Sequence, residues 1–66
     1  MRLTVNGKPV ELPEGSTIVG LLGELAIEAA RVAVERNQDV VPRATWGDAT
    51  LLDGDQIEIV TFVGGG

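Results

Sequence analysis

The sequence contains no cysteine and no histidine. Their absence removes disulfide bonds, thiolate nucleophiles, imidazole bases and nearly every transition-metal site. Basic residues are also few, because Lys and Arg together number 5 against 10 acidic residues and leave a net charge of −5. This balance opposes binding to phosphate backbones and to anionic lipid surfaces, so neither nucleic acid nor a membrane is an expected partner.

Long hydrophobic runs are missing as well. No apolar segment approaches the roughly 20 residues that span a bilayer, and residues 1–4 do not begin a signal peptide, so we expect a cytoplasmic protein.

We expect a single domain over residues 1–66, because a domain this small buries only about 60% of the surface that its unfolded chain exposes. So small a core leaves little room for a walled catalytic pocket. We therefore expect the chain not to be an enzyme but to work inside a partner's active site.

The first 12 residues predict a β-hairpin. Apolar residues alternate over 2–5 and 9–12, and Asn6-Gly7 between the two segments tolerates the positive φ angles of a type I′ turn. Pro9 has no N–H to donate, so the second strand should lie at an edge of the sheet.

Residues 18–25 predict a helix. Its apolar positions, spaced i, i+3, i+4 and i+7, are Ile18, Leu21, Leu22 and Leu25. Ser16 or Thr17 can cap the N-terminus, and we expect the helix to end between residues 25 and 30. Gly20 and Gly23 each weaken a helix by about 1 kcal/mol relative to Ala. We interpret them as points where the helix packs closely on the sheet.

Three further strands are expected in the second half of the chain. Residues 31–36 alternate again and predict a third strand, and 40–41 predict a short fourth strand that Pro42 ends. After a turn at 53–55, residues 56–63 carry the strongest β signal in the sequence.

The expected fold is α+β, with a mixed sheet of four to five strands covered on one face by one helix. The predicted order is strand, strand, helix, strand, strand, strand. A single helix covers only one face of a sheet, so the opposite face should be wet or used by a partner.

Three glycines, Gly64, Gly65 and Gly66, follow the most hydrophobic strand directly. Glycine loses more conformational freedom on ordering than any other residue, which predicts a flexible tail at 64–66. A backbone without Cβ atoms can thread a narrow channel, and three residues reach roughly 10 Å at about 3.3–3.6 Å each. Taken alone, the glycines are equally compatible with a frayed end or a linker remnant.

The candidate reactive group is the free carboxylate of Gly66. A carboxylate is a poor electrophile at neutral pH, so its chemistry must begin with activation, for which we expect adenylation with ATP. Attack by sulfide or a persulfide would then lead to a terminal thiocarboxylate, which carries sulfur without a cysteine. Attack by a lysine amine would give an isopeptide bond.

Several segments carry a resemblance that covers the whole chain. They are VERN at 34–37, VPR at 41–43, Trp46, LDGD at 52–55 and IEIVTFVGGG at 57–66. Together they resemble the ThiS family, the sulfur carriers of thiamine thiazole synthesis. The run over 57–66 is the specific part of this resemblance.

The resemblance implies a ubiquitin-like β-grasp fold with the first and last strands parallel at the centre of the sheet. It also implies three partners: a ThiF-like adenylyltransferase, a sulfur donor fed by a cysteine desulfurase, and a ThiG-like thiazole synthase. Gly66 would hold the acyl-adenylate and then the thiocarboxylate, while Gly64 and Gly65 thread the partner's active site. ATP and magnesium would belong to the adenylating partner, and this chain would bind no cofactor.

Other residues have weaker claims to a role. Phe62 and Val63 lie where the last strand ends, so they are candidates for partner contact as much as for the core. The polar group 35–37 is interpreted as a strand end and a turn, and Trp46 as a cover for one edge of the core. The scattered acidic residues favour a solvated surface over a metal site.

Two alternatives stay open at this point. The chain could be the small subunit of a molybdopterin synthase, since those sulfur carriers share the fold and also end in glycines. It could instead be a ubiquitin-like protein modifier or an interaction module, because an activated terminus serves modification as well as sulfur carriage.

Overall fold

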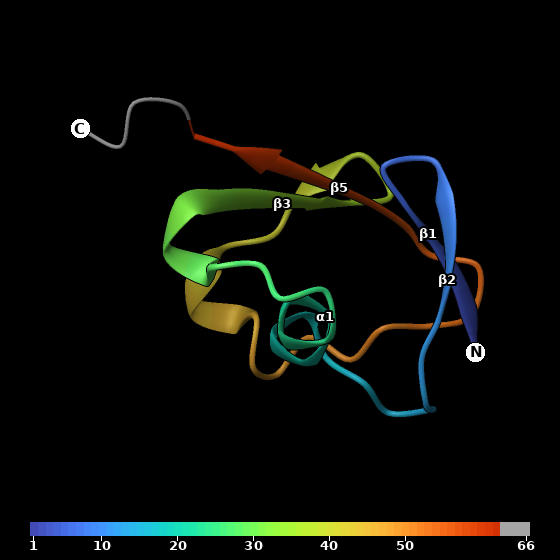
Figure 1. Ribbon diagram of the computed structural model, residues 1–66. Helices are drawn as coiled ribbons and strands as arrows, with labels where there is room; N and C mark the ends of the chain where they lie inside the picture. Colours follow the sequence, from blue (N-terminus) through green and yellow to red (C-terminus); the bar gives the residue numbers. More distant parts are fainter. Residues whose placement is uncertain (63–66) are drawn as a thin grey trace.

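A computed structural model describes residues 1–62 (Figure 1). Its strands and helices are β1 Arg2–Val5, β2 Lys8–Glu11, α1 Ile18–Glu24, the 3₁₀ turn η1 Ala29–Arg31, β3 Val32–Arg36, β4 Asp39–Val40, the 3₁₀ turn η2 Arg43–Thr45 and β5 Gln56–Thr61. The strands form one sheet in the order β2-β1-β5-β3-β4. Figure 1 shows α1 lying across one face of this sheet. The predicted mixed sheet with one helix is therefore confirmed.

The middle of the sheet is formed by β5, the last strand of the chain. It pairs in parallel with β1, where Val5 lies opposite Ile57, and antiparallel with β3, where Val34 lies opposite Ile59. The expected parallel pairing of the first and last strands is thus confirmed. Because a central strand has a neighbour on both sides, the chain's C-terminal strand is held by two ladders of hydrogen bonds.

The β1–β2 hairpin forms as predicted. Asn6 and Gly7 adopt φ angles of 51° and 81°, the left-handed values that a type I′ turn requires. Pro9 lies in β2, and β2 is an edge strand. The missing N–H of Pro9 therefore costs the sheet no ladder bond.

Helix α1 begins at the predicted cap. The hydroxyl oxygen of Thr17 accepts a hydrogen bond from the Gly20 N–H at 3.2 Å, which satisfies one of the free donors of the first turn. Ser16 does not cap the helix, and its hydroxyl instead donates to the Pro13 carbonyl.

The helix ends at Glu24, one residue before the predicted range. Ala26 adopts a left-handed φ of 57°, and its N–H donates to Gly23 while that of Ile27 donates to Leu22. These two bonds form a Schellman motif with alanine at the position where glycine is usual. No glycine marks this helix end in the sequence, so the usual signal for a helix C-terminus is missing.

The prediction that Gly20 and Gly23 pack closely on the sheet is wrong. Both residues are exposed, and a Cβ atom added at Gly23 would meet nothing within 4 Å. A Cβ atom at Gly20 would meet only the Thr17 hydroxyl, at 3.7 Å. The helix buries the stripe formed by Ile18, Leu21 and Leu22, and the two glycines lie off that stripe.

The later strands differ from the prediction by single residues. Strand β3 begins at Val32 because Arg31 belongs to η1, and β4 is Asp39–Val40 rather than 40–41. The turn between them places Asn37 and Gln38 at positive φ. Strand β5 follows the predicted 56–63 as far as Thr61; Val63 and the tail 64–66 lie outside the described residues.

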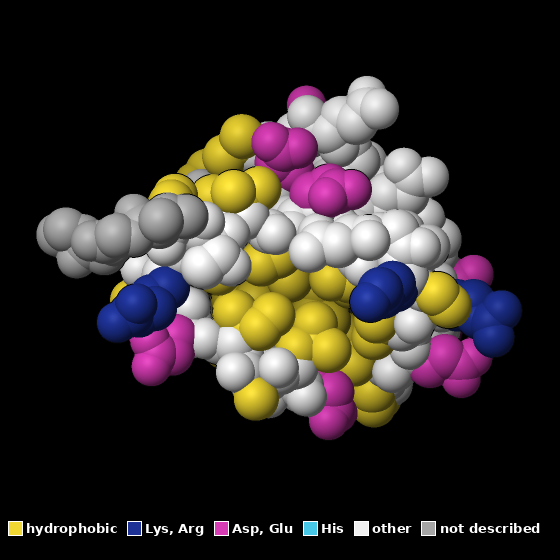
Figure 2. Space-filling model, turned by 45° about the horizontal axis from the view of Figure 1, so that its top comes forward, with side chains coloured by type: hydrophobic (Ala, Val, Ile, Leu, Met, Phe, Trp, Pro, Cys, Tyr) yellow, Lys and Arg dark blue, Asp and Glu magenta, His cyan; other side chains and the backbone are white. Residues whose placement is uncertain are grey.

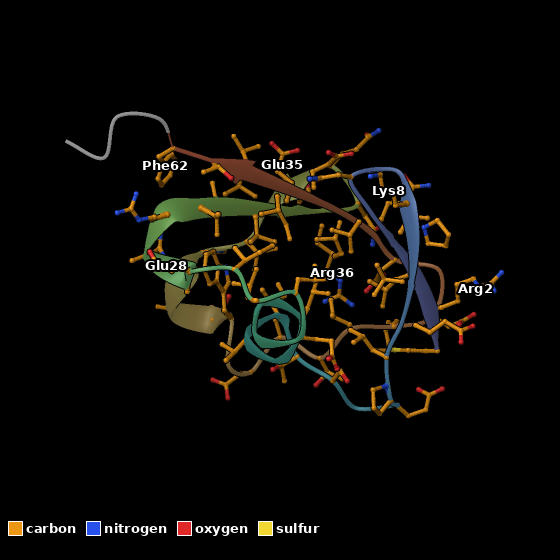
Figure 3. All side chains as sticks on the ribbon, viewed as in Figure 1. Arg2, Lys8, Glu28, Glu35, Arg36 and Phe62 are labelled. Carbon is orange, nitrogen blue, oxygen red and sulfur yellow. The ribbon has the colours of Figure 1, made fainter. Side chains whose placement is uncertain are left out.

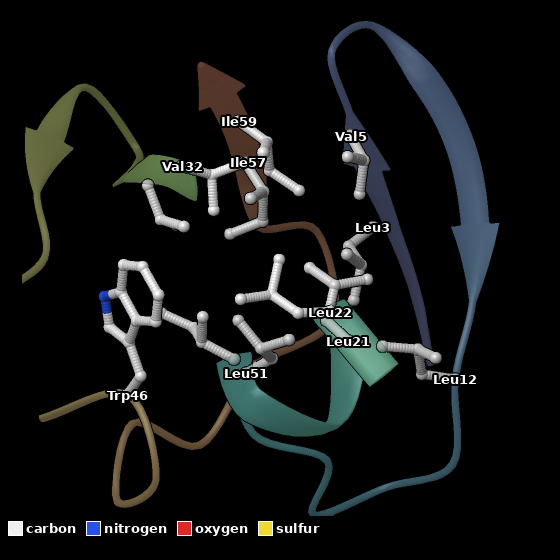
Figure 4. Packing of buried hydrophobic residues seen from close by; sticks show 12 residues of the cluster. Leu3, Val5, Leu12, Leu21, Leu22, Val32, Trp46, Leu51, Ile57 and Ile59 are labelled. Atoms are coloured by element: carbon white, nitrogen blue, oxygen red, sulfur yellow. The ribbon is translucent and has the colours of Figure 1, made fainter. Parts of the chain in front are cut away.

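One hydrophobic core lies between the sheet and α1 (Figure 4). Its buried members are Leu3, Val5, Leu12, Ile18, Leu21, Leu22, Val32, Val34, Trp46, Leu51, Ile57 and Ile59. Trp46 is 3% exposed, and its indole N–H donates to the Val41 carbonyl, so its predicted packing on the core is confirmed. On the other face of the sheet, Val40 and Val60 are 70% and 52% exposed.

Candidate functional site

The candidate site begins where β5 leaves the sheet. Thr61 pairs with Val32, and the Phe62 N–H donates to the Arg31 carbonyl at 2.8 Å. The backbone is thus held on its β3 side up to residue 62. Three residues, 63–65, lie between this point and Gly66 in the sequence.

Asn6 holds the opposite side of β5. The regular β1–β5 ladder pairs only Thr4 with Gln56 and Val5 with Ile57. Beyond it, the Asn6 side chain accepts from the Ile59 N–H at 2.7 Å and donates to the Ile59 carbonyl at 3.2 Å. The side chain of Asn6 therefore pairs with the backbone of Ile59 as one more residue of a neighbouring strand would.

Phe62 stands at the end of β5 and is 52% exposed (Figure 3). The sequence left open whether this ring packs in the core or faces a partner, and the structure leaves it out of the buried cluster. Val63, Gly64, Gly65 and Gly66 lie outside the described residues. Their predicted roles, like the partner contact of Phe62, stay predictions.

The polar group at 35–37 is divided between the two sides of the sheet. Figure 3 shows Glu35 on the side away from α1 and Arg36 beneath the sheet. Arg36 Nη2 lies 2.8 Å from Asp55 Oδ2, and the Asn37 amide donates to Asp55 Oδ1 at 3.1 Å. Asn37 also accepts from the Gln56 N–H. This agrees with the structural interpretation of 35–37, since Arg36 and Asn37 fasten the turn to the start of β5.

Asp55 is a buried carboxylate, 6% exposed. Burial by itself would raise the pKa of this group, but the Leu52 N–H, Asn37 and Arg36 all donate to the ionised form and hold the pKa below its ordinary value. Asp55 is therefore a charged anchor within the fold.

Arg43 supports the opposite end of β5, where Thr61 pairs with Val32. Its guanidinium donates to the carbonyls of Ala29 and Val32, on either side of Arg31, and stacks on the Trp46 ring. Sequence reasoning assigned no role to Arg43, although it belongs to the VPR segment. A role that depends on carbonyls 11 and 14 residues away leaves no local signal.

A groove of about 340 Å³ opens on the helix side of the sheet, next to the end of β5. Its apolar walls are Val5, Val10, Leu25, Ile27 and Ile59, and its polar members are Asn6, Lys8 and Thr61. Figure 2 shows hydrophobic side chains gathered in this hollow. The strand that leads to the glycines therefore borders an apolar depression, which the sequence analysis did not foresee.

Residues 1–62 bring no three possible metal ligands together. Within the same part of the chain, no helix has the length and apolar character needed to cross a membrane.

The strand order, the single helix and the central C-terminal strand define a ubiquitin-like β-grasp protein. Residues 3–66 match the model of the ThiS family, and the chain therefore belongs to that family. The crystal structure of the thiamine biosynthesis protein ThiS from Geobacter metallireducens superposes with a TM-score of 0.86 at 40% identity, covering 100% of both chains.

Curated relatives fall into two groups. The chain is 42% identical over 65 residues to the sulfur carrier protein ThiS of Bacillus subtilis, covering 97% of this chain and 98% of that one. It is also 42% identical over its whole length to a segment of the thiazole synthase of Paramagnetospirillum magneticum. The chain spans 20% of that longer protein.

Proposed function

We propose that this chain is a sulfur carrier in thiamine biosynthesis and works in the cytoplasm. The observation that carries the proposal is the family match, which extends over residues 3–66 and so includes the three glycines. The chain acts as a co-substrate of partner enzymes and not as a catalyst. This assignment fits a sequence without cysteine or histidine, which offers neither a thiolate nor an imidazole for catalysis.

The reacting group is the α-carboxylate of Gly66. A ThiF-like adenylyltransferase binds ATP and magnesium; the carboxylate oxygen attacks the α-phosphorus, and pyrophosphate leaves. The resulting acyl-adenylate is a mixed anhydride, so its carbonyl carbon is open to nucleophiles. Activation is needed because the free carboxylate resists attack.

Sulfur then replaces the adenylate. A sulfide ion that attacks the carbonyl releases AMP and leaves a thiocarboxylate at Gly66. A persulfide supplied through a cysteine desulfurase forms an acyl disulfide instead, from which a thiol releases the thiocarboxylate and forms a disulfide with the donor.

A ThiG-like thiazole synthase is the proposed acceptor of the sulfur. Support comes from the thiazole synthase of Magnetococcus marinus, which carries a segment 47% identical to the whole of this chain. That relative has a segment similar to this chain in the same polypeptide as a thiazole synthase, an arrangement that a direct transfer of sulfur would favour.

Partner contact is proposed for Phe62, Val63, Gly64 and Gly65. Phe62 is the last described residue, exposed and held at its backbone by Arg31. A fixed point of departure lowers the entropy lost when the following residues enter a narrow active site. The glycines add no side chain that a channel would have to accommodate.

The proposal is tested by intact mass spectrometry of the 66-residue chain after co-expression with a ThiF-like enzyme. We expect the mass increase of one oxygen replaced by sulfur, and alkylation by a thiol-reactive probe that peptide mapping localises to Gly66. The sequence has no cysteine, so such a probe has no competing thiol.

Two altered chains serve as controls. Deletion of Gly66 should abolish thiocarboxylate formation and leave the far-ultraviolet circular dichroism unchanged. A chain extended by one alanine after Gly66 keeps every native residue but moves the carboxylate, and it should also stay unmodified. Thiocarboxylation of the deletion variant to the wild-type level would refute the assignment to Gly66.

A further inference from the structure

The last described residue, Phe62, is held by a hydrogen bond to the turn η1, Ala29–Arg31. The bond runs from the Phe62 N–H to the Arg31 carbonyl at 2.8 Å. None of the three described residues of this turn is buried, and its first position has no side-chain cap. The side chains of the turn itself are therefore not held by core packing, which begins again at the next residue, Val32.

The ion pair within this segment is too exposed to fix it either. Arg31 Nε lies 2.8 Å from Glu28 Oε2, but the two side chains are 65% and 74% exposed. Ion pairs of this kind contribute between zero and about 1 kcal/mol. Besides the pairing of Val32 with Thr61, a further contact holds this turn.

Arg43 provides this further contact with two hydrogen bonds. Nη1 of Arg43 donates to the Ala29 carbonyl, and Nη2 donates to the Val32 carbonyl at 2.9 Å. The two acceptors bracket the Arg31 carbonyl along the chain. A planar guanidinium holds two acceptors in a fixed relation, which an ammonium group on a flexible stem does not do.

The guanidinium is itself anchored to the core. Its carbon lies 4.7 Å from the centroid of the Trp46 ring, a cation–π distance. Trp46 is 3% exposed and bonded through its indole N–H to the Val41 carbonyl at 2.9 Å. Figure 4 shows the Trp46 ring within the cluster of buried side chains. A continuous series of contacts thus runs from the core through Arg43 to the carbonyls of Ala29 and Val32, which lie on either side of the Arg31 carbonyl along the chain.

We propose that Arg43 is a positioning residue for the C-terminal end of the chain. By fixing η1 it sets the point and direction in which the backbone leaves the sheet after Phe62. The inference rests on the proposed function, because its consequence is felt when an adenylating enzyme takes up Gly66. Residues 63–66 follow Phe62 and end in that carboxylate, and they span at most about 14 Å. The position of Phe62 therefore limits how far the carboxylate can extend into the enzyme's active site.

The test compares Arg43→Lys with the matched control Glu28→Gln. The lysine variant keeps the positive charge and loses the two-pronged contact, whereas the glutamine variant removes only the exposed ion pair of the same turn. Two readouts are measured at a temperature where all three proteins are fully folded: the hydrogen exchange of the Phe62 amide, and the steady-state kinetics of adenylation. The Ile59 amide, which is bonded to Asn6 and not to η1, is the internal reference for exchange.

We expect Arg43→Lys to lose most protection at Phe62 while Ile59 keeps its own. The KM for the carrier should rise about 3- to 10-fold, as one or two more groups are ordered on binding, with kcat nearly unchanged. Glu28→Gln should match the wild type in both readouts. A purely structural role for Arg43 would lower the melting temperature without moving KM.

The remaining outcomes overturn the inference. Unchanged protection at Phe62 means that Arg43 does not fix the turn. Lost protection with an unchanged KM means that the fixed turn does not position the chain end. A raised KM with intact protection points to direct contact between Arg43 and the enzyme. If the wild type is never adenylated, the proposed function fails, and the exchange readout still decides whether Arg43 controls Phe62.

Discussion

Arg36 and Asp55 form an ion pair with 2.8 Å between Nη2 and Oδ2, and Asp55 is buried. Arg36 is the last residue of β3, and Asp55 is the residue before β5, so the pair fastens two neighbouring strands at one end. The Leu52 N–H and the Asn37 amide complete the carboxylate's partners. The start of β5 is therefore fixed by charge and hydrogen bonds, while its far end is fixed by Arg31 and Asn6.

Asp55→Asn should destabilise the protein at neutral pH and reduce the acid sensitivity of its stability. Ionised Asp55 has a pKa below its ordinary value of 3.8, so its stabilisation is complete at higher pH and is lost as pH falls through the folded-state pKa. We expect a loss of about 2 kcal/mol in the free energy of unfolding at pH 7. Urea denaturation at several pH values from roughly pH 5 downward checks this.

The comparison of slopes decides that prediction. The free energy of unfolding of the wild type should fall more steeply with acid than that of Asp55→Asn, so that the two curves converge at low pH. Parallel curves would show that Asp55 has the same pKa in the folded and unfolded chains.

Gly23→Ala should stabilise the protein by about 0.5–1 kcal/mol. Gly23 lies in α1, and a Cβ atom there meets nothing within 4 Å, so alanine gains helix propensity at no steric cost. The matched control is Gly54→Ala, where the added Cβ atom also meets nothing but φ is +88°. That variant should lose about 1 kcal/mol or more, because alanine resists left-handed backbone. Thermal unfolding of both variants measures the two changes, and a destabilised Gly23→Ala would contradict the open site.

Phe62→Ala should weaken handling of the chain by an adenylating enzyme and barely affect the fold. The ring is 52% exposed, so the free energy of unfolding should fall by less than about 1 kcal/mol. If Phe62 anchors a partner, KM for the carrier should rise about tenfold. Val19→Ala removes an equally exposed side chain from α1 and should leave KM unchanged. Equal KM values for the two variants would remove Phe62 from the interface.

Local sequence patterns predicted the elements whose cause is local. Asn6-Gly7 takes the positive φ angles that its residue types allow, and Thr17 caps α1 through a bond only three residues long. The alternation over 56–61 gives β5 one buried face, with Ile57 and Ile59 pointing inward. Each of these follows from conformational preference or from period-two burial, which neighbouring residues decide.

Two features of α1 were missed or misread. The helix ends one residue before the predicted range because Ala26 adopts a left-handed φ. Alanine rarely takes this conformation, so its presence in the sequence does not indicate a helix end. The glycines of α1 were assigned to the sheet side, although the buried stripe of the helix leaves them facing solvent. Propensity tells that a glycine weakens a helix, but only packing tells which way it faces.

The sequence by itself determined the element order, the edge position of β2 and the glycine end as the candidate site, and its resemblance to the ThiS family added the central place expected for β5. Tertiary structure alone decided how the chain leaves the sheet toward that end. Asn6 reaches Ile59 across 53 residues, and Arg43 reaches Ala29 across 14. Such contacts depend on the three-dimensional approach of segments that no local pattern relates, because a side chain's hydrogen-bond partner is fixed only when the fold brings the two together.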